Sequence, residues 1–175
     1  MTSEHSSSTN FLNSSMGIII RPIEHKDNPV IAELIKTVFR EFKIDKPGTV
    51  YTDPTTNDLF NLFNKPGSAY WVAEEDGELL GGCGIYPTTG LPENCAELVK
   101  FYLLPVARGK GIGRVLMGRS FMSAVSSGYE QLYLESFPEL GTAVNMYEKA
   151  GFKHIEKPLG NSGHHACTIW MLKNL

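Results

Sequence analysis

Residues 99–118 read Val-Lys-Phe-Tyr-Leu-Leu-Pro-Val-Ala-Arg-Gly-Lys-Gly-Ile-Gly-Arg-Val-Leu-Met-Gly, and this stretch decides the fold. It begins with an apolar and β-branched run typical of a strand, which Pro105 ends because proline has no backbone N–H. A glycine-rich turn follows, and apolar residues then recur at helical spacing: Ile112, Val115, Leu116 and Met122. The sequence therefore predicts a strand, a turn and a helix that packs on a sheet through these apolar residues.

The turn and the start of the helix have the chemistry of an anion-binding site. Glycines let a ligand come close to the backbone, and the first N–H groups of a helix are unpaired at the positive end of its dipole. Arg108, Lys110 and Arg114 add positive charge. This combination predicts a pyrophosphate-binding site. The structural alternative is a glycine-rich turn that only caps a helix.

Two common phosphate-binding motifs do not match this turn. The pattern G-x-G-x-x-G requires a glycine where Leu116 stands, and G-x-x-x-x-G-K-[ST] does not occur in the chain. The pattern that matches is R-x-x-G-x-G, formed by residues 108–113 directly after a strand that ends in Leu-Leu-Pro. This motif resembles the acetyl-CoA-binding motif of the GNAT superfamily of N-acetyltransferases, in which the loop wraps the coenzyme pyrophosphate with successive amides.

The order of the remaining elements agrees with this resemblance. Apolar periodicity, Asn-Pro and Asp-Pro helix starts and the Asp76-Gly77 turn predict strands at 17–22, 70–74, 79–86, 96–104, 131–135, 152–156 and 167–173. Helices are expected at 28–42, 54–63, 112–127 and 142–150. The resemblance spans residues 17–172 and implies an α/β (α+β) GNAT fold, a seven-stranded mixed sheet flanked by four helices.

Length and composition limit the number of domains, the kinds of partner and the location of the protein. The chain has 175 residues, 42% of them hydrophobic, and a net charge of −3, which suits one domain at 16–175 after a disordered Ser/Thr/Asn-rich tail at 1–15. No run of Lys and Arg could follow nucleic acid or an anionic membrane, and no apolar run reaches membrane-spanning length. Three separated cysteines without a signal peptide predict a cytoplasmic protein with reduced thiols.

The resemblance assigns the coenzyme-binding residues by their place in the motif. In GNAT proteins a bulge splays the central strand from its neighbour, the pantetheine arm inserts there, and a backbone N–H meets the acetyl carbonyl. On this chain that carbonyl contact falls on Phe101, Tyr102 and Leu103, and the pantetheine contact on Asn145. The pyrophosphate contact falls on the glycine loop: Arg108, Gly109, Lys110, Gly111, Ile112, Gly113 and Arg114.

Two residues are expected to move protons. Tyr147, in the family-like run Asn-Met-Tyr-Glu-Lys-Ala-Gly-Phe at 145–152, would protonate the departing thiolate, because a phenol with a pKa of roughly 10 is protonated at neutral pH. The alternative is a tyrosine that only packs in its helix. Glu97 would take the proton of the amine, or instead hold the acceptor ammonium or pair with Lys100. Glu135 is the rival base, and Tyr102 is a candidate for ordering water.

The loop Gly-His-His-Ala-Cys at 163–167 looks at first like a metal site. Neither C-x-x-C nor H-E-x-x-H accompanies it, so we expect no metal and assign His164 and His165 to acceptor binding, with a purely structural loop as the alternative. This loop, Lys-Pro-Gly at 46–48 and the closing Trp-x-Leu-Lys-x-Leu are similar to a GNAT subgroup that also occurs fused to MarR-type regulators.

The resemblance implies an acetyl-CoA-dependent N-acetyltransferase that moves an acetyl group to the primary amine of a small molecule in a ternary complex. No base accompanies Cys83, Cys95 or Cys167 in the sequence, which disfavours an acyl-cysteine intermediate. The alternatives are a protein or peptide acceptor, a longer acyl group, or a module that senses acetyl-CoA or an amine without turnover. GNAT proteins are often dimers, so the resemblance allows a homodimer, with neither nucleic acid nor membrane as a partner.

Overall fold

A computed structural model of the chain describes residues 17–175, so the tail predicted at 1–15 lies outside the described residues. The described part has one sheet, whose strands are β1 (Ile19–Pro22), β2 (Ala69–Glu75), β3 (Glu78–Tyr86), β4 (Cys95–Leu103), β5 (Gln131–Ser136), β6 (Lys153–His154) and β7 (Ile169–Asn174). The helices are α1 (Asn28–Glu41), α2 (Leu59–Leu62), α3 (Ile112–Ser126) and α4 (Gly141–Lys149). Short 3-10 helices are η1 (His25–Asp27), η2 (Pro54–Asn57), η3 (Pro105–Ala107) and η4 (Pro138–Leu140). The predicted seven-stranded α/β fold with four helices is confirmed.

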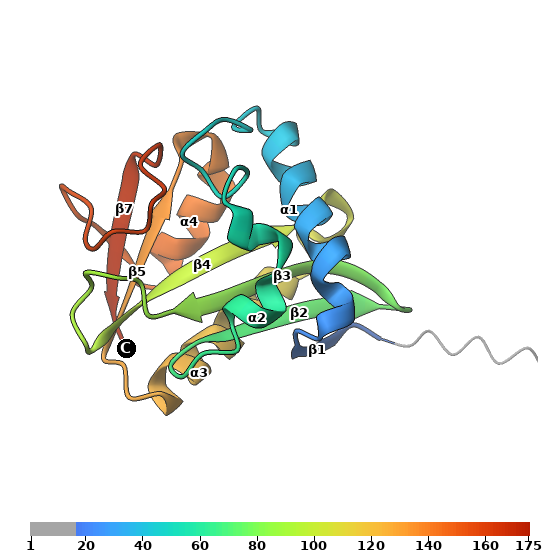
Figure 1. The fold of residues 1–175 in the computed structure, drawn as a ribbon, viewed down its shortest axis with the longest axis horizontal. Helices are drawn as coiled ribbons and strands as arrows, with labels where there is room; N and C mark the ends of the chain where they lie inside the picture. Colours follow the sequence, from blue (N-terminus) through green and yellow to red (C-terminus); the bar gives the residue numbers. More distant parts are fainter. Residues whose placement is uncertain (1–16) are drawn as a thin grey trace, which may run out of the picture.

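The sheet is mixed, and its one parallel pair is central to the site. The strand order is β1-β2-β3-β4-β5-β7-β6, in which β4 and β5 run parallel and the other neighbours run antiparallel. A parallel pair needs a crossover, and α3 supplies it between β4 and β5. Figure 1 shows α1 and α2 over one face of the sheet and α3 and α4 over the other.

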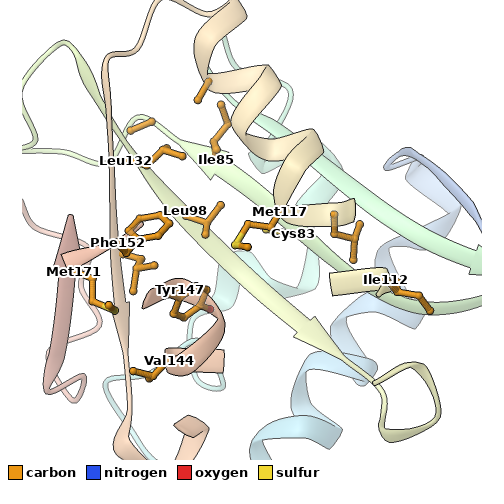
Figure 2. Packing of buried hydrophobic residues seen from close by; sticks show 14 of the residues in the cluster. Cys83, Ile85, Leu98, Ile112, Met117, Leu132, Val144, Tyr147, Phe152 and Met171 are labelled. Carbon is orange, nitrogen blue, oxygen red and sulfur yellow. The ribbon is translucent and has the colours of Figure 1, made fainter. Parts of the chain in front are cut away.

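Each face of the sheet buries its own hydrophobic core. Leu98 of β4 and Leu132 of β5 pack in one cluster with Met117 of α3 and Tyr147 of α4 (Figure 2). On the opposite face, Tyr70 and Val72 of β2 pack with Phe39 of α1, as the period-2 alternation of a strand buried on both sides requires. The two cores fix the distance between the helices and the ends of β4 and β5, where the site lies.

The hairpin of β2 and β3 agrees with its prediction. Asp76 and Gly77 both adopt positive φ, 51° and 86°, as the tight turn of a two-residue hairpin requires. The glycines of β3 leave room for an aromatic side chain. A Cβ on Gly82 would lie 2.6 Å from Cε1 of Tyr70, and one on Gly84 would lie 2.6 Å from Cδ2 of the same ring. The close approach expected from these glycines is therefore that of a buried tyrosine.

The predicted packing face of α3 is confirmed for Ile112 and Leu116 and wrong for Val115 and Met122. Val115 and Met122 are 49% and 63% exposed, whereas the buried residues of the helix are Ile112, Gly113, Leu116, Met117, Ser120 and Ala124. The contact face therefore includes small residues, which let the helix lie close to the sheet. Counting large apolar residues selected a face that is partly solvent-exposed.

Other boundaries differ where side chains are used for tertiary contacts. Asp27, not Asn28, is the N-cap of α1, and the Asn28 amide instead donates to Asp58 Oδ1 (2.7 Å) and accepts from the Phe60 N–H (2.9 Å). The helix predicted at 54–63 is two short pieces, η2 and α2, with an interruption at Asp58. The strand predicted at 152–156 shrinks to the two residues of β6.

Candidate active site

A cleft opens where β4 and β5 part. Their parallel pairing covers only Cys95–Glu97 against Gln131–Tyr133, although β4 continues to Leu103 and β5 to Ser136. Beyond Glu97 the two strands diverge, and the cleft between them is lined by Phe101, Glu135 and Tyr147, among others. The backbone of β4 on this side is not paired with β5, so its N–H groups are available to a ligand.

A bulge in β4 accompanies this divergence. Gly84 pairs with Val99 and Gly82 with Tyr102, so β4 has one residue more than β3 across this interval. Lys100 lies in the bulge with a φ of 49°, a left-handed conformation unusual for a residue other than glycine. Its carbonyl accepts a hydrogen bond from the Tyr70 hydroxyl (2.8 Å), which holds the bulge in place.

The glycine loop presents the open start of α3. Gly109 and Gly111 have φ values of 74° and 79°, which an L side chain adopts only with strain, and Gly111 is the N-cap. Lys110 and Arg114 are exposed beside it. Ile112 is buried, so only its backbone faces the loop, and a Cβ on Gly113 would crowd Leu103 and Phe101 at 3.1 and 3.2 Å. The loop thus gathers amide donors and two cations as pyrophosphate binding requires.

Arg108 has a different environment from the rest of its motif. Its guanidinium forms a bidentate pair with Glu41 at 2.6 and 2.8 Å and donates twice to the Leu103 carbonyl. The group also lies 5.2 Å from the ring centroid of Phe42. These contacts tie the glycine loop to the end of α1. The guanidinium therefore stabilises the position of the glycine loop, and its contact with the coenzyme stays a prediction.

Tyr147 lies at the bottom of the cleft. It is 6% exposed, and its ring centroid is 6.0 Å from that of Phe101 on β4. Burial raises the pKa of the Tyr147 hydroxyl, so the phenol stays protonated at every working pH. Asn145, predicted to contact the pantetheine arm, is exposed on the same helix. The structure therefore brings a protonated hydroxyl to the splayed strands.

Glu97 is a buried carboxyl at the point of divergence. It is 4% exposed and accepts a short hydrogen bond from the Thr88 hydroxyl. Burial raises the pKa of Glu97 to about 8; Thr88 and Lys100 act against this shift, and Glu135 adds to it. A carboxyl with a pKa near the working pH both accepts and releases a proton readily, which is the property of a general base.

A second cavity meets the cleft at Glu97. It has a volume of about 520 Å³, and its walls come from residues 48–55, the end of β3, the Thr88-Thr89 pair and the loop at 161–165. Four residues line both the cavity and the cleft, and we call them the junction: Glu97, Val99, Lys100 and His164. A ligand in the cavity thus reaches the coenzyme cleft beside Glu97.

Glu135, the rival base, is fully engaged. Its Oε1 accepts from the Tyr133 hydroxyl (2.8 Å) and its Oε2 from the Ser162 hydroxyl (2.7 Å). Ser162 Oγ also accepts from the His164 N–H (3.0 Å). Glu135 therefore orients the loop at 161–165, and both of its oxygens accept side-chain hydrogen bonds, whereas Glu97 accepts one only at Oε2. Its role as a base stays a prediction.

The two histidines lie in different environments. His164 Nε2 is 3.0 Å from Asp53 Oδ2, whereas His165 is exposed with its ring against Gly48. Burial tends to raise the pKa of the Asp53 carboxyl, but the hydrogen bond to His164 and the charge of Lys100 outweigh it, and the pKa is lowered. The sequence identified Asp53 as a helix cap, which it is, since it accepts from the Thr55 N–H (2.9 Å). Its link to His164 across 111 positions carries no local signal.

Three residues of the site were missed from the sequence or underused there: Asp53, Thr88 and Lys100. The sequence offered Lys100 only as a surface partner of Glu97, but it is 6% exposed and lies at the junction. A charged residue inside a predicted central strand was the available signal, because such a position is normally buried and apolar.

In the described part of the chain, the three cysteines are buried thiols without a disulfide partner. Burial raises the pKa of the Cys83 and Cys167 thiols to about 12 and that of Cys95 to about 11, so all three stay protonated. Between residues 17 and 175, no three His, Cys, Asp or Glu side chains gather as metal ligands would. In the same range no helix is both long and apolar enough to cross a bilayer.

Comparison with known proteins supports one family. The family model described as Acetyltransferase (GNAT) family matches residues 33–152. An uncharacterized N-acetyltransferase of Escherichia coli, YjgM, is 40% identical over 90% of this chain and 95% of its own. An acetyltransferase of Staphylococcus aureus superposes with a TM-score of 0.79 at 20% identity, covering 91% and 99% of the two chains. The PaiA N-acetyltransferase of Thermoplasma acidophilum, solved with coenzyme A, superposes with a TM-score of 0.69 at 20% identity, covering 91% and 100%.

Proposed function

The chain belongs to the GNAT family of acetyltransferases, and on that premise we propose that it transfers the acetyl group of acetyl-CoA directly to the primary amine of a small molecule. The observation that carries the proposal is the position of Glu97. This carboxyl faces the coenzyme cleft on one side and the 520 Å³ cavity on the other. A base is useful only where amine and thioester meet, and the junction is that place.

Each step of the proposed reaction uses a different group of the chain. Glu97 takes one proton from the acceptor ammonium, and the free amine attacks the thioester carbon. Backbone N–H groups at Phe101–Leu103 stabilise the oxyanion. As the new C–N bond forms and the C–S bond breaks, Tyr147 protonates the leaving sulfur and regains a proton from the acylated nitrogen. Burial raises the pKa of the Tyr147 phenol, and it raises the pKa of the coenzyme thiol in the same cleft in the same direction. The proton donor and the leaving thiolate are therefore shifted together.

The coenzyme half of the proposal rests on the glycine loop. We assign the pyrophosphate to the backbone of residues 109–113 with Lys110 and Arg114 beside it, and the pantetheine arm to the gap between β4 and β5 near Asn145. The relative from Thermoplasma acidophilum was solved with coenzyme A, which supports this ligand.

A small acceptor is favoured by the shape of the cavity. Its volume of about 520 Å³ lies inside the range of roughly 300–1,000 Å³ typical of small-molecule sites. The loop at 161–165 forms one wall and is held by Ser162 on Glu135 and by the Ala166 N–H on the Gly48 carbonyl (3.1 Å). A protein or peptide acceptor remains the second candidate. We also propose a cytoplasmic location, which three unpaired cysteines support, while a homodimer stays a prediction.

The test is mass spectrometry of the acceptor after incubation with protein and acetyl-CoA. Amino acids, polyamines, aminoglycosides and short peptides are offered separately, each with and without protein. We expect acetylation within one small-molecule class at rates well above those for peptides. Acetylation of peptides alone would overturn the assignment of a small acceptor, and tight acetyl-CoA binding with no product from any amine would favour a sensor.

Substituting Tyr147 with phenylalanine is expected to lower turnover roughly 10²-fold, the usual scale for loss of one acid–base group. Affinity for acetyl-CoA should stay within about threefold, because the ring still packs against Phe101. Tyr129→Phe is the matched control, since its hydroxyl binds the Gly67 carbonyl (2.9 Å) away from both cavities. Unchanged turnover in Tyr147→Phe would assign protonation of the sulfur to water or to another residue.

A further inference from the structure

Two nitrogen donors lie beside Glu97 at the junction. Lys100 is 6% exposed, and its ammonium donates to Thr56 Oγ1 (3.1 Å) and Asp53 Oδ2 (3.3 Å). An ammonium carries three N–H donors. Lys100 lines both the cleft and the cavity, so its remaining donor is available to a ligand at the transfer point.

His164 binds the same carboxylate oxygen as Lys100. Its Nε2 lies 3.0 Å from Asp53 Oδ2, and the other oxygen, Oδ1, is used by the N–H and hydroxyl of Thr55. One carboxylate thus faces two basic groups, the Lys100 amine and the His164 ring. Burial lowers the pKa of Lys100, and the charges of Asp53 and Glu97 act against this shift. When both are charged, Asp53 offsets only one of them. Among these three groups one positive charge is then left over, and Glu97 is the carboxyl group that lies beside them at the junction.

The partners of Glu97 complete the pattern. Oε2 of Glu97 accepts from the Thr88 hydroxyl, and the charged or titratable groups that act on this carboxyl are Glu135 and Lys100. Its second oxygen is left for the acceptor amine. Among the described residues, the junction therefore offers one hydrogen-bond acceptor for an amine, and the third N–H of Lys100 beside the His164 ring for a group close to it.

We propose that Lys100 and His164 form an anion subsite, so that the acceptor is amino acid-like: a primary amine with a carboxylate on the neighbouring carbon. The inference rests on the proposed function and names its substrate class. Across one tetrahedral carbon, an amine nitrogen and a carboxylate oxygen lie about 3 Å apart. Both groups therefore fall within a single junction, the amine on Glu97 and the carboxylate on Lys100 and His164.

Other amines fit this arrangement less well. A polyamine or an aminoglycoside brings further ammonium groups toward the buried Lys100, and the carboxylate nearest to that lysine, Asp53, is already shared with His164. A peptide N-terminus carries a neutral amide where the subsite offers positive charge. Charge-assisted hydrogen bonds are about twice as strong as neutral ones, so a free carboxylate is the preferred neighbour of the amine.

The test measures binding without turnover. Free L-amino acids and their primary amides are titrated singly into the protein loaded with coenzyme A, which has no acetyl group to transfer, and heats are recorded by calorimetry. Each amide keeps the shape of its acid and removes the charge. We expect at least one free acid to bind about 10- to 100-fold more tightly than its amide, the range that charge-assisted hydrogen bonds provide.

Lys100→Met is expected to bring the affinities of the free acid and its amide to within about threefold of each other. Because this variant leaves Asp53 without its cation, the double variant Lys100→Met/Asp53→Asn provides a charge-balanced version. Lys65→Met is the matched control: Lys65 is exposed, 5.3 Å from the centroid of the Tyr86 ring at the cavity wall, and its loss should leave the ratio of the two affinities unchanged. Coenzyme A binding checks that each variant keeps its fold.

Each outcome decides the inference. Equal binding of acid and amide by the unsubstituted protein, no binding of any free amino acid, or an acid preference that survives in coenzyme-binding Lys100 variants would each overturn it. Acid-selective binding with no thiol release from acetyl-CoA would leave the subsite standing and refute the enzymatic function. Turnover of amines or peptides without a preference for a free carboxylate would refute the subsite and leave the enzymatic function standing.

Discussion

Replacing Gly111 with aspartate is expected to abolish measurable binding of acetyl-CoA. Gly111 is the N-cap of α3 with a φ of 79°, where a non-glycine residue is strained. The new carboxylate would also lie beside the N–H groups that we assign to the pyrophosphate, and like charges at that distance repel. The strain should lower folding stability by on the order of 1–3 kcal/mol. The charge repulsion should weaken affinity by at least about 10²-fold, which corresponds to about 2.7 kcal/mol.

Gly128→Asp separates the charge effect from backbone strain. Gly128 follows the other end of α3, is exposed, has a φ of 85°, and leaves open space for a Cβ, as Gly111 does. Both variants should therefore lose similar amounts of folding stability in thermal unfolding. Only Gly111→Asp should lose coenzyme affinity in calorimetry. Normal affinity in Gly111→Asp, or equal losses in the two variants, would refute the assigned pyrophosphate site.

Glu97→Gln is expected to lower kcat by about 10²- to 10⁴-fold while acetyl-CoA affinity changes little. Glutamine has the shape of the buried carboxyl and still accepts from Thr88, but it takes no proton from an ammonium. In the unsubstituted protein kcat/KM should rise with pH through about 8, the pKa of Glu97, because only the carboxylate is a base. The residual activity of Glu97→Gln should lack that rise. A profile that keeps it would assign the base to another group.

The same substitution should stabilise the fold at neutral and alkaline pH. The folded-state pKa of Glu97 is raised above its unfolded value, so its contribution to stability is fully present below about pH 4.5 and is lost as pH rises toward 8. Glutamine has no such loss, and the unfolding free energy of the variant at pH 8 should exceed that of the parent by about 4 kcal/mol, because the pKa of Glu97 rises from 4.5 to about 8 on folding. Chemical denaturation at pH 5 and pH 8 measures the difference. Equal stability of the two proteins at both values would contradict the buried, proton-binding state of Glu97.

The parts of this site that are encoded locally were predictable from the sequence. A strand that ends at a proline, a turn with Gly109 and Gly111, and a helix that begins directly after them depend on neighbouring residues, and all three were placed correctly. The hairpin turn at Asp76-Gly77 is local in the same sense, because both residues tolerate positive φ. Glu97 and Tyr147 were selected because each lies close to a family-like motif; both line the cleft, and their catalytic roles stay predictions.

Contacts between distant segments were not predictable. Arg108 is held by Glu41, 67 positions away, and Asp53 joins His164 and Lys100 from three separate parts of the chain. Lys100 lies at the junction only because the bulge adds a residue to β4, and the periodicity of a regular strand does not reveal a bulge. The face of α3 was predicted only in part, because its close contact with the sheet includes Gly113, Ser120 and Ala124, which carry little hydrophobic signal.

Release of free thiol from acetyl-CoA, measured with and without an amine, tests the central claim most directly. The unsubstituted protein should release thiol only when a suitable amine is present, in equal amount to the acetylated amine, and Gly111→Asp should release none at the same concentrations. Thiol release that does not depend on amine would indicate hydrolysis. Absence of release with every amine and peptide, from protein that binds acetyl-CoA, would contradict the assignment of an N-acetyltransferase.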